Sequence, residues 1–306
     1  MMRTGLSFFW ERGLLVHGRM NMKNSLQLDS PAKINLRLEI LKRRPDGYHE
    51  LRTVFQKISL HDTLHFSLRK EEGISIAADH PELPLGKKNL VYKAAQSMFK
   101  ACGYRGGVRI EIEKKIPLGA GLGGGSSNAA TTLMALNQLL EVNLSRKELM
   151  DAGLGIGADV PFFFLEGAAI GSGVGERLKK EVLPALWYVL IYPNFEISTR
   201  WAYHHFVLTN QRFRINLHKF LKTPEGISRI LFNHLEEVVS KRYPEISLMK
   251  EYLLSAGALG ALMTGSGPTV FGFFTEAKSA EGASAKIKRW VARKGWAVFK
   301  ARALAV

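Results

Sequence analysis

Five glycines lie within seven residues of the segment 117–130, which reads PLGAGLGGGSSNAA. Glycine has no Cβ, so this stretch can adopt positive φ angles and turn several backbone N–H groups toward one point, a geometry that binds phosphate. Apolar residues at helical spacing follow at 129, 133, 136 and 140, so the loop should open a helix whose positive end faces the same anion. Ser126 and Ser127 offer N-cap hydroxyls for that helix. The stretch therefore predicts a cradle for nucleotide phosphates.

Two well-known phosphate loops fit this stretch poorly. A Walker A loop needs a lysine and then Ser or Thr after its second glycine, whereas Gly124 is followed by Gly125. The glycine spacing matches a dinucleotide-binding loop, but that loop follows a fully apolar parallel strand. Residues 108–113 instead alternate apolar and charged, which is typical of a strand with one wet face. A flexible glycine linker is also disfavoured, because a strand and an amphipathic helix frame the loop.

Two further side chains are candidates for acid–base chemistry. Lys33 and Asn35 lie two residues apart in a strand pattern, so they share one face of that strand. A strand lysine taken alone is most often a solvated charge. Asp159 directly precedes the apolar run 160–165, where we expect a strand because Pro161 favours extended geometry before it. Its residue type leaves two roles open, a turn former or a functional carboxylate.

An aromatic ring and an imidazole follow a predicted turn. Pro45, Asp46 and Gly47 have the composition of a turn, which would place Tyr48 and His49 at the rim of a sheet. A ring beside a hydrogen-bonding imidazole suits the recognition of a flat base. The alternative is an ordinary packed tyrosine with a surface histidine.

Composition limits the classes of protein that these residues can belong to. The chain has 306 residues, of which 46% are hydrophobic, enough for one large or two ordinary domains. Its net charge of +16 suits nucleic acid, a membrane surface or a polyanionic small substrate. The basic residues are spread along the chain without an arginine-rich motif, which disfavours nucleic acid. Cys102 is the only cysteine, which suits a reducing cytoplasm and excludes an intrachain disulfide.

Neither a membrane span nor a secretory signal is expected. No uninterrupted apolar run reaches transmembrane length, and Glu11 and Arg12 split the apolar residues near the start. We therefore expect a cytoplasmic protein. Residues 1–24 are interpreted either as an ordered appendage or as an upstream start, and the sequence leaves both open.

The order of predicted elements changes near residue 184. Before it, strands at 26–40, 51–58, 63–68 and 74–77 are followed by a helix from about 90 that Asn89 caps, a strand at 108–113, the cradle and its helix. A short helix then begins after Ser145, with Glu148 at the capping-box position, and a hairpin spans 167–180.

After residue 184 the pattern has a strand at 186–192, helices at 200–207, 227–240 and 244–255, strands at 259–264 and 269–274, a helix at 280–293 and a last strand at 297–304. Without the extra helices this is β-α-β-β-α-β, the ferredoxin-like plan. The segment TGSGPT, 264–269, forms the turn between the middle strands.

These segments together resemble the GHMP kinases, the family that includes galactokinase and the homoserine and mevalonate kinases. The run 117–127 is similar to the second motif of that family, and 264–269 is similar to its third. The segments PAKINL (31–36) and RPDGYH (44–49) resemble the branch that phosphorylates diphosphocytidyl-methylerythritol. The resemblance runs from about residue 28 to the end of the chain.

The resemblance implies an α+β fold of two domains, one similar to ribosomal protein S5 and one ferredoxin-like. The boundaries that we predict are 1–24 for the N-terminal extension, 25–183 for the ATP-binding domain and 184–306 for the C-terminal domain. The implied activity is transfer of the γ-phosphate of ATP to an alcohol. ATP and the diphosphocytidyl substrate are the expected partners, without nucleic acid or membrane, and the oligomeric state is left open.

The resemblance also implies roles for individual residues. Lys33 and Asp159 are the expected catalytic pair. The residues expected to bind ATP are Asn89, Pro117, Leu118, Gly119, Ala120, Gly121, Leu122, Gly123, Gly124, Gly125, Ser126 and Ser127. The second phosphate loop is expected at Gly265, Ser266 and Gly267. The residues expected to bind the substrate are Asn35, Tyr48, His49, Phe55, Thr199 and Tyr203, with Tyr48 and Tyr203 on the two sides of the cytosine. For Phe55, ordinary core packing is the alternative.

Mg²⁺ is expected with the nucleotide, and its protein ligands are left open. Ser198 stands where the family more often has proline, which leaves the geometry of the neighbouring substrate loop open. Two other functions are weighed. Another small-molecule GHMP kinase would not need Tyr48, His49 and Tyr203. A basic nucleic-acid-binding protein on the same fold would explain the charge but would not need Asp159.

Overall fold

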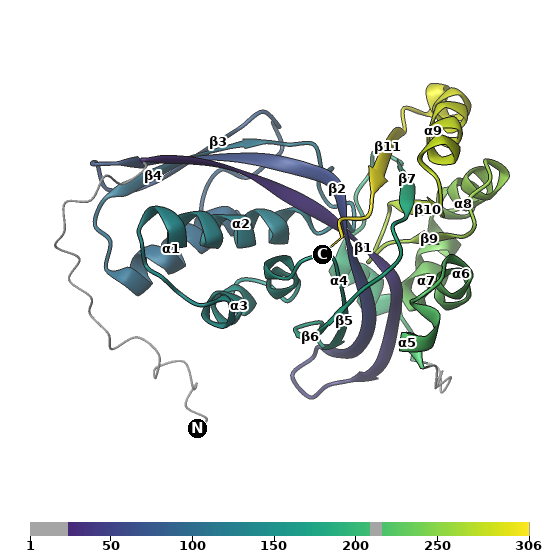
Figure 1. Cartoon of the computed structure of the whole chain (residues 1–306), viewed down its shortest axis with the longest axis horizontal. Coiled ribbons are helices and arrows are strands. Elements are labelled where there is room, and N and C mark those ends of the chain that lie inside the picture. The colour runs from purple at the N-terminus through teal and green to yellow at the C-terminus, as the bar shows by residue number, and fades with distance from the viewer. Residues whose placement is uncertain (1–23, 209–215, 306) are drawn as a thin grey trace.

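A long antiparallel hairpin forms the centre of the molecule (Figure 1). The computed structural model describes residues 24–208 and 216–305, so nearly all of the predicted N-terminal extension lies outside the described residues. Strand β1 (Ser25–Arg43) pairs with β2 (His49–Arg69) along almost its whole length. The two strands predicted at 51–58 and 63–68 are one continuous strand. The predicted turn at 45–47 joins β1 to β2, with Gly47 at a φ of +85°.

The first sheet is built on this hairpin and carries helices on one face (Figure 1). Its main order is β3-β4-β2-β1-β8, with β5 on β2 and β6 on β5. The other strands are β3 (Gly73–Ala78), β4 (Gly107–Glu113), β5 (Ala168–Gly173), β6 (Arg177–Glu181) and β8 (Phe232–Asn233). The helices are α1 (Leu90–Cys102), α2 (Gly124–Leu139) and α3 (Arg146–Leu154). Their apolar residues, such as Leu133 and Leu136, pack on Leu64 and Phe66 of β2.

The first sheet and the helices α1, α2 and α3 form the N-terminal unit. The starts of these helices follow the predicted capping chemistry with one exception. Asn89 caps α1, and Ser145 with Glu148 forms the capping box of α3, as predicted. The prediction of serine caps for α2 is wrong, because its N-cap is Gly123 at a φ of +71°. A glycine in this left-handed conformation lets the chain enter the helix before the serines.

The strand predicted after Asp159 is also wrong. Val160–Phe164 forms a short 3₁₀ helix, η1, and Asp159 is its N-cap residue. Pro161 lies in the first turn, where a missing N–H is tolerated, so proline here is compatible with a helix as well as with a strand. All five residues of η1 are buried, which explains the continuous apolar run.

The second sheet has the predicted ferredoxin-like plan. Its four strands lie in the order β11-β7-β10-β9, and all neighbours are antiparallel. The strands are β7 (Trp187–Tyr192), β9 (Ala261–Met263), β10 (Val270–Phe274) and β11 (Ala297–Arg302). Helices α8 (Glu245–Ser255) and α9 (Ala277–Val291) supply the two crossings, and η2 (Ala292–Lys294) follows α9.

The extra helices differ from the prediction at two places: the short helix at 217–220 was not predicted, and the helix predicted at 227–240 is divided. They are α4 (Thr199–His205), α5 (Leu217–Phe220), α6 (Pro224–Ile230) and α7 (His234–Arg242). The single helix predicted at 227–240 is interrupted by β8, which pairs in parallel with β1 through Arg37 and Leu38. Asn233 ends this short strand and caps α7 by accepting a hydrogen bond from the N–H of Leu235.

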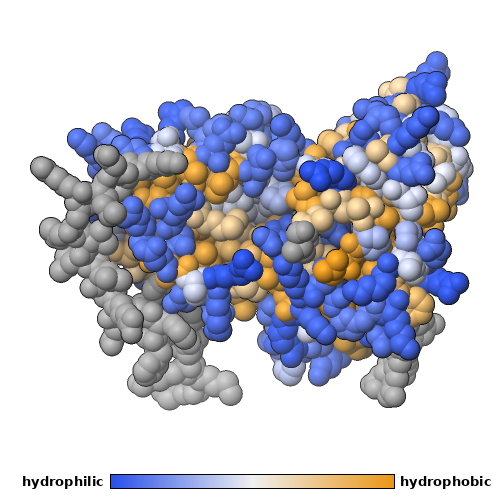
Figure 2. Space-filling model, viewed as in Figure 1, coloured by the Kyte–Doolittle hydropathy of each residue, from blue (hydrophilic) through white to orange (hydrophobic). Residues whose placement is uncertain are grey.

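The second sheet and its helices form the C-terminal unit, and it shares a hydrophobic core with the N-terminal unit. Ala32, Ile34 and Leu36 of β1 pack in one cluster with Leu190 of β7 and Phe271 of β10. The predicted boundary between 183 and 184 falls between β6 and β7. On the face in Figure 2, hydrophilic residues are spread over both units instead of forming one patch. No helix of the described segments is long and apolar enough to cross a membrane.

Candidate active site

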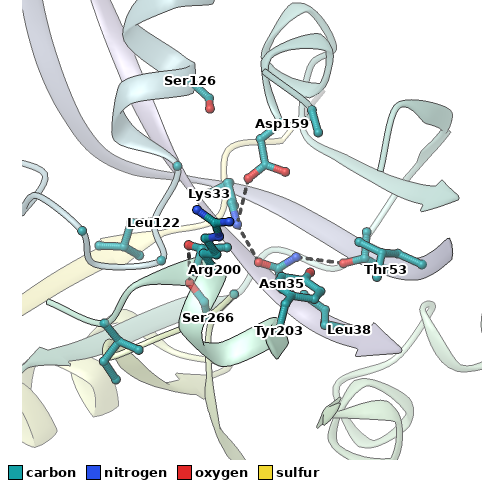
Figure 3. A pocket seen from close by; sticks show the side chains of 18 of the residues that line it. Lys33, Asn35, Leu38, Thr53, Leu122, Ser126, Asp159, Arg200, Tyr203 and Ser266 are labelled. Carbon is teal, nitrogen blue, oxygen red and sulfur yellow. Dashed lines mark hydrogen bonds and ion pairs between the residues drawn. The ribbon is translucent and has the colours of Figure 1, made fainter. Parts of the chain in front are cut away.

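A cavity of about 1250 Å³ lies where the two units meet, and both predicted phosphate loops line it. Residues 117–126 form one part of its wall, and Gly265 and Ser266 form another. All of the residues predicted to bind the substrate also line it. Lys33 and Asp159 point toward one another inside it (Figure 3).

Lys33 and Asp159 form an ion pair at the centre of this cavity. The Lys33 Nζ atom lies 3.4 Å from Asp159 Oδ2, and it donates a hydrogen bond of 2.7 Å to Asn35 Oδ1. Asn35 Nδ2 in turn donates to Thr53 Oγ1 at 2.8 Å. The side chain of Lys33 is 4% exposed and that of Asp159 is 34% exposed. The carboxylate is therefore held by a buried cation while one side of it remains open to a ligand.

The strands and η1 explain how two residues far apart in sequence meet. Lys33 lies on β1, where its N–H donates to Leu122 O of the glycine loop at 2.9 Å. Phe55 of β2 lies beneath the ammonium, with its ring centroid 5.5 Å from Lys33 Nζ. It also stacks on Phe162 of η1 at 4.8 Å, so Phe55 both lines the cavity and packs in the core. That packing fixes η1 and places Asp159 opposite Lys33.

The glycine loop adopts backbone geometry that requires glycine. Gly119, Gly121 and Gly123 have φ angles of +57°, +75° and +71°. A Cβ on Gly121 would lie 2.4 Å from Thr264 O, and one on Gly123 would lie 3.0 Å from Lys33 Cε. The glycine loop therefore touches the second predicted phosphate loop on one side and Lys33 on the other.

The second loop is tied to both units by hydroxyl contacts. Ser266 Oγ lies 2.8 Å from Thr199 Oγ1 at the start of α4 (Figure 3). Thr264 Oγ1 accepts a hydrogen bond from the N–H of Asn35 at 2.9 Å. Ser198, at the position where proline is commoner, caps α4 by accepting from the N–H of Trp201 at 3.3 Å. The serine thus gives this substrate loop a defined helix start.

Three predicted site residues lie outside the cavity wall among the described residues. The side chain of Asn89 accepts from the N–H of Val91 and donates to Pro84 O, so its hydrogen-bonding groups serve the cap of α1. Ser127 is buried against Ser30, which donates to it at 2.8 Å. Gly267 stands behind Ser266 with a φ of +79°.

Aromatic residues form the end of the cavity near the β1–β2 turn. The rings of His49 and Tyr203 stack with centroids 5.3 Å apart, whereas Tyr48 is 64% exposed at the rim. Burial, and then the nearby Arg43, lower the pKa of His49. Burial, and then the Asp159 charge, raise the pKa of Tyr203. Both rings are therefore neutral near pH 7. The ring next to Tyr203 is that of His49, and the pairing of Tyr48 with Tyr203 across a base stays a prediction.

Several cations of the cavity wall were not among the predicted site residues. These cations are Arg43, Lys114 and Arg200. Among the described residues that line the cavity, Asp159 is the only acidic one. Lys114 is paired with the buried Asp62. Two signals pointed to two of these residues: Lys114 lies three residues before the start of the glycine loop, and Arg200 lies between the predicted Thr199 and Tyr203. The excess of positive charge suits a polyanionic ligand.

The described residues contain no group of three or more His, Cys, Asp and Glu side chains that could hold a metal ion. A divalent ion at this site would therefore depend on ligand oxygens as well as on protein.

Comparison with known proteins agrees with this geometry. The model for the N-terminal domain of GHMP kinases matches residues 89–167, and the model for the C-terminal domain matches 216–293. A 4-diphosphocytidyl-2-C-methyl-D-erythritol kinase of Syntrophotalea carbinolica is 45% identical over 271 residues, 88% of this chain and 96% of that protein. One from Geobacter metallireducens is 43% identical over 281 residues, 92% of this chain and 99% of that protein.

Solved structures give the same result for the fold. A 4-(cytidine 5′-diphospho)-2C-methyl-D-erythritol kinase superposes with a TM-score of 0.79 at 34% identity, covering 92% of this chain and all (100%) of that one. A homoserine kinase of Cytophaga hutchinsonii superposes with a TM-score of 0.74 at 22% identity, over 94% and 97% of the two chains, which shows the fold alone. The chain therefore belongs to the GHMP kinase family, in the branch of the 4-diphosphocytidyl-2-C-methyl-D-erythritol kinases.

Proposed function

We propose that this kinase transfers the γ-phosphate of ATP to the 2-hydroxyl of 4-diphosphocytidyl-2-C-methyl-D-erythritol, giving the 2-phosphate and ADP. The reaction belongs to non-mevalonate synthesis of isoprenoid precursors. The observation that carries the proposal is the Lys33–Asp159 pair, 3.4 Å apart, in one cavity with two glycine loops and the aromatic residues His49 and Tyr203.

The phosphates of ATP fit the two loops at the N-terminus of α2. Backbone N–H groups and the positive end of a helix attract phosphate oxygens, and the glycines let the backbone approach closely. Gly121 and Thr264 bring the two loops into contact, so one triphosphate can touch both. Lys33 and Arg200 add positive charge to the wall.

Asp159 accepts the proton of the attacking hydroxyl. The hydroxyl oxygen forms a bond to the γ-phosphorus, the bond from that phosphorus to the β–γ bridging oxygen breaks, and ADP leaves with the electron pair. Phosphoryl transfer depends on positioning and charge neutralisation, so the proton can move late. Lys33 orients the carboxylate through their ion pair, while the hydrogen bond to Asn35 fixes the lysine.

The cytosine binds at the aromatic end of the cavity. Base–aromatic stacking is worth about 1–3 kcal/mol per base, and Tyr203 offers a ring face that His49 now covers. A bound cytosine would replace the His49 ring on the face of Tyr203. His49 would then form hydrogen bonds with the edge of the base, and Tyr48 could contact the base from the rim of the cavity. Arg43 and Arg200 lie in the same wall and suit the diphosphate.

The donor set of the cavity fits Mg²⁺, which usually takes one or two protein oxygens together with phosphate oxygens and water. The Asp159 carboxylate and the Ser126 hydroxyl both line the cavity (Figure 3). When bound, the ion neutralises charge on the phosphates. The single cysteine of the chain suits the reducing cytoplasm, where we place the reaction, and we propose no nucleic acid or membrane partner.

The test is turnover by the purified full-length chain, measured as ADP release and as product by ³¹P NMR. We expect product with 4-diphosphocytidyl-2-C-methyl-D-erythritol and competitive inhibition by CDP against that substrate. Homoserine and mevalonate serve as matched alcohols without cytosine. Equal turnover with either of them, or no inhibition by CDP, would assign the chain to another small-molecule reaction of the family.

A further inference from the structure

One buried cation of the protein has no counter-ion among the described residues. Lys57 of β2 is 8% exposed, and no carboxylate of the described chain lies within ion-pair distance of its Nζ atom. The other buried charged side chains all have partners: Lys33 with Asp159, Arg37 with Glu39, Lys114 with Asp62, and Glu181 with His218. Lys57 Nζ donates one hydrogen bond, to Phe163 O at 2.8 Å. An ammonium group has three donors, so this one keeps capacity for a ligand.

Lys57 lines a second cavity of about 400 Å³. This cavity lies behind the active site, because Ser127 of α2 and Phe163 of η1 belong to its wall. Lys33 and Lys57 are direct cross-strand partners on β1 and β2, yet each faces a different cavity. The ring of Phe163 lies near both lysines: a Cβ on Gly123 would be 3.0 Å from Phe163 Cζ and 3.0 Å from Lys33 Cε, and Lys57 Nζ lies 5.8 Å from the centroid of the ring.

The two cations and two carboxylates that line this second cavity do not form ion pairs with one another. Arg146, at the start of α3, also lines it and makes no ion pair with any described residue. The two carboxylates at the rim are engaged elsewhere: Asp29 lies 3.6 Å from His61, and Glu166 lies 3.3 Å from Lys180. Both are exposed. Two cations thus share a cavity whose acidic neighbours already have partners, an arrangement that a bound anion would relieve.

The remaining wall is largely apolar. Met134 and Leu149 come from α2 and α3, and Phe163 and Phe164 from η1. The buried hydroxyl of Thr131 adds a polar group. A cavity of this size with a cationic end and an apolar body suits a small organic molecule that carries one anionic group.

We propose that this second cavity binds a small organic anion, a carboxylate or phosphate on an apolar body, through Lys57 and Arg146. The site is separate from the phosphate loops. It borders them through η1, because Lys57 is bonded to the short helix that Asp159 begins.

The state of Lys57 gives this site a pH dependence. Burial lowers the pKa of Lys57 from its ordinary value of 10.5 to about 8, and Glu166 raises it less than burial lowers it, while Arg146 lowers it further. The charged groups facing it are Glu166 beyond η1, Arg146 on α3 and Asp29 on β1. Lys57 is protonated below its pKa. The affinity for an anion is therefore full near pH 7 and falls as the pH rises above about 8, the pKa of Lys57 in the protein without ligand.

The experiment is calorimetric titration of the full-length chain with benzoate and with phenyl phosphate at pH 7, in saturating ADP. Benzyl alcohol is the neutral control of the same shape. We expect at least one anion to bind at least about tenfold more tightly than the alcohol, and the stronger of the two identifies the preferred head group. Lys57→Met should weaken binding about tenfold or more, and Arg146→Gln severalfold.

Lys147→Gln is the matched charge control, because Lys147 is 82% exposed on the same helix, pairs with Asp151 and does not line the cavity. It should leave affinity unchanged. Arg146 is exposed, so Arg146→Gln tests the site even if Lys57→Met disturbs folding. The proposal would be overturned if Lys57→Met or Arg146→Gln bound the anion as tightly as the wild type, or if neither anion bound. It would also be overturned if the anion competed with ADP, or if its affinity stayed constant from pH 7 to well above 8.

Discussion

Among single residues, the proposed mechanism gives the buried ammonium of Lys33 and the partly exposed carboxylate of Asp159 one joint role. Removing the charge from Asp159 in Asp159→Asn should lower kcat by about 10²–10⁴, the usual scale for a general base. Lys33→Met should cause a similar loss. The double variant should be scarcely worse than either single one, because residues acting as a unit lose their joint contribution once. Steady-state kinetics of the three variants measures this.

Asp151→Asn is the control, since Asp151 pairs with Lys147 on the surface of α3 and should leave kcat unchanged. Losses that multiply across Lys33 and Asp159 would argue against a coupled pair. Turnover close to wild type in Asp159→Asn would remove the base from the mechanism.

Tyr203 is the residue that most directly reports on cytosine binding. Tyr203→Ala should raise the KM for the diphosphocytidyl substrate about ten- to a hundredfold, because stacking on a base is worth about 1–3 kcal/mol. The KM for ATP should not change. Tyr203→Phe keeps the ring and should retain most of the affinity. If both variants weaken the substrate equally, the hydroxyl and not the ring face carries the contact.

Residue types alone were ambiguous for most of this site. A strand lysine and an aspartate before an apolar run have ordinary explanations, and only the resemblance predicted that Lys33 and Asp159 act together. Arg200 was not predicted, because its place between Thr199 and Tyr203 was the only signal and a helix arginine is most often a solvated charge. The partner of each side chain is set by pairing between distant segments, which residue types do not encode.

At the scale of elements, the contact between the two glycine loops is the feature most sensitive to one added carbon. Gly121→Ala would place a Cβ 2.4 Å from Thr264 O at a φ of +75°. The loops would have to separate, so ATP affinity should fall far more than substrate affinity. Gly282→Ala is the matched control, because Gly282 lies in α9 outside the cavity wall and its Cβ would meet nothing within 4 Å. Binding of ATP and of the diphosphocytidyl substrate to both variants, by calorimetry, provides the comparison. Equal losses of ATP and substrate in Gly121→Ala would indicate misfolding instead.

The buried Lys57 in β2 should destabilise the fold near neutral pH. Its pKa is lowered to about 8 in the folded protein, so between that value and 10.5 the unfolded chain binds more protons and stability rises with pH. Lys57→Met removes this penalty and should raise the free energy of unfolding by about 3 kcal/mol at pH 7. The advantage should shrink as the pH rises from 8 through 10.5. Urea denaturation of both proteins at several pH values measures it, and an advantage independent of pH would contradict the assigned cause.

Most elements could be predicted from periodicity and caps, and the failures have physical causes. Ser145 with Glu148 fixed the start of α3 because both halves of the capping box are local. The run after Asp159 reads as a strand because full burial removes the periodicity that separates a strand from a helix. The pattern at 227–240 is helical on both sides of β8, and only pairing with β1 interrupts it. Ser126 and Ser127 were displaced as caps by the left-handed Gly123.

At the scale of the whole molecule, the two units should unfold together. They share one hydrophobic cluster, and Ile58 of β2 forms a bridge with Ala303. The four tryptophans of the described segments, Trp187, Trp201, Trp290 and Trp296, all lie in the second unit. Tryptophan fluorescence therefore follows that unit, and far-ultraviolet circular dichroism follows both. The two denaturation curves should coincide. Separate midpoints would show that each unit is stable without the other.

The route of the chain through this shared core has a consequence for its synthesis. Ala32, Ile34 and Leu36 leave the ribosome well before the strands that cover them, and the N–H of Leu304 can donate to Lys57 O only after residue 304 has been made. At roughly 5–20 residues per second, these apolar side chains wait on the order of ten seconds or longer for their partners. The nascent chain must therefore carry one uncovered face of its central hairpin until the second sheet has been made, which makes it a client for factors that shield exposed apolar surface during translation.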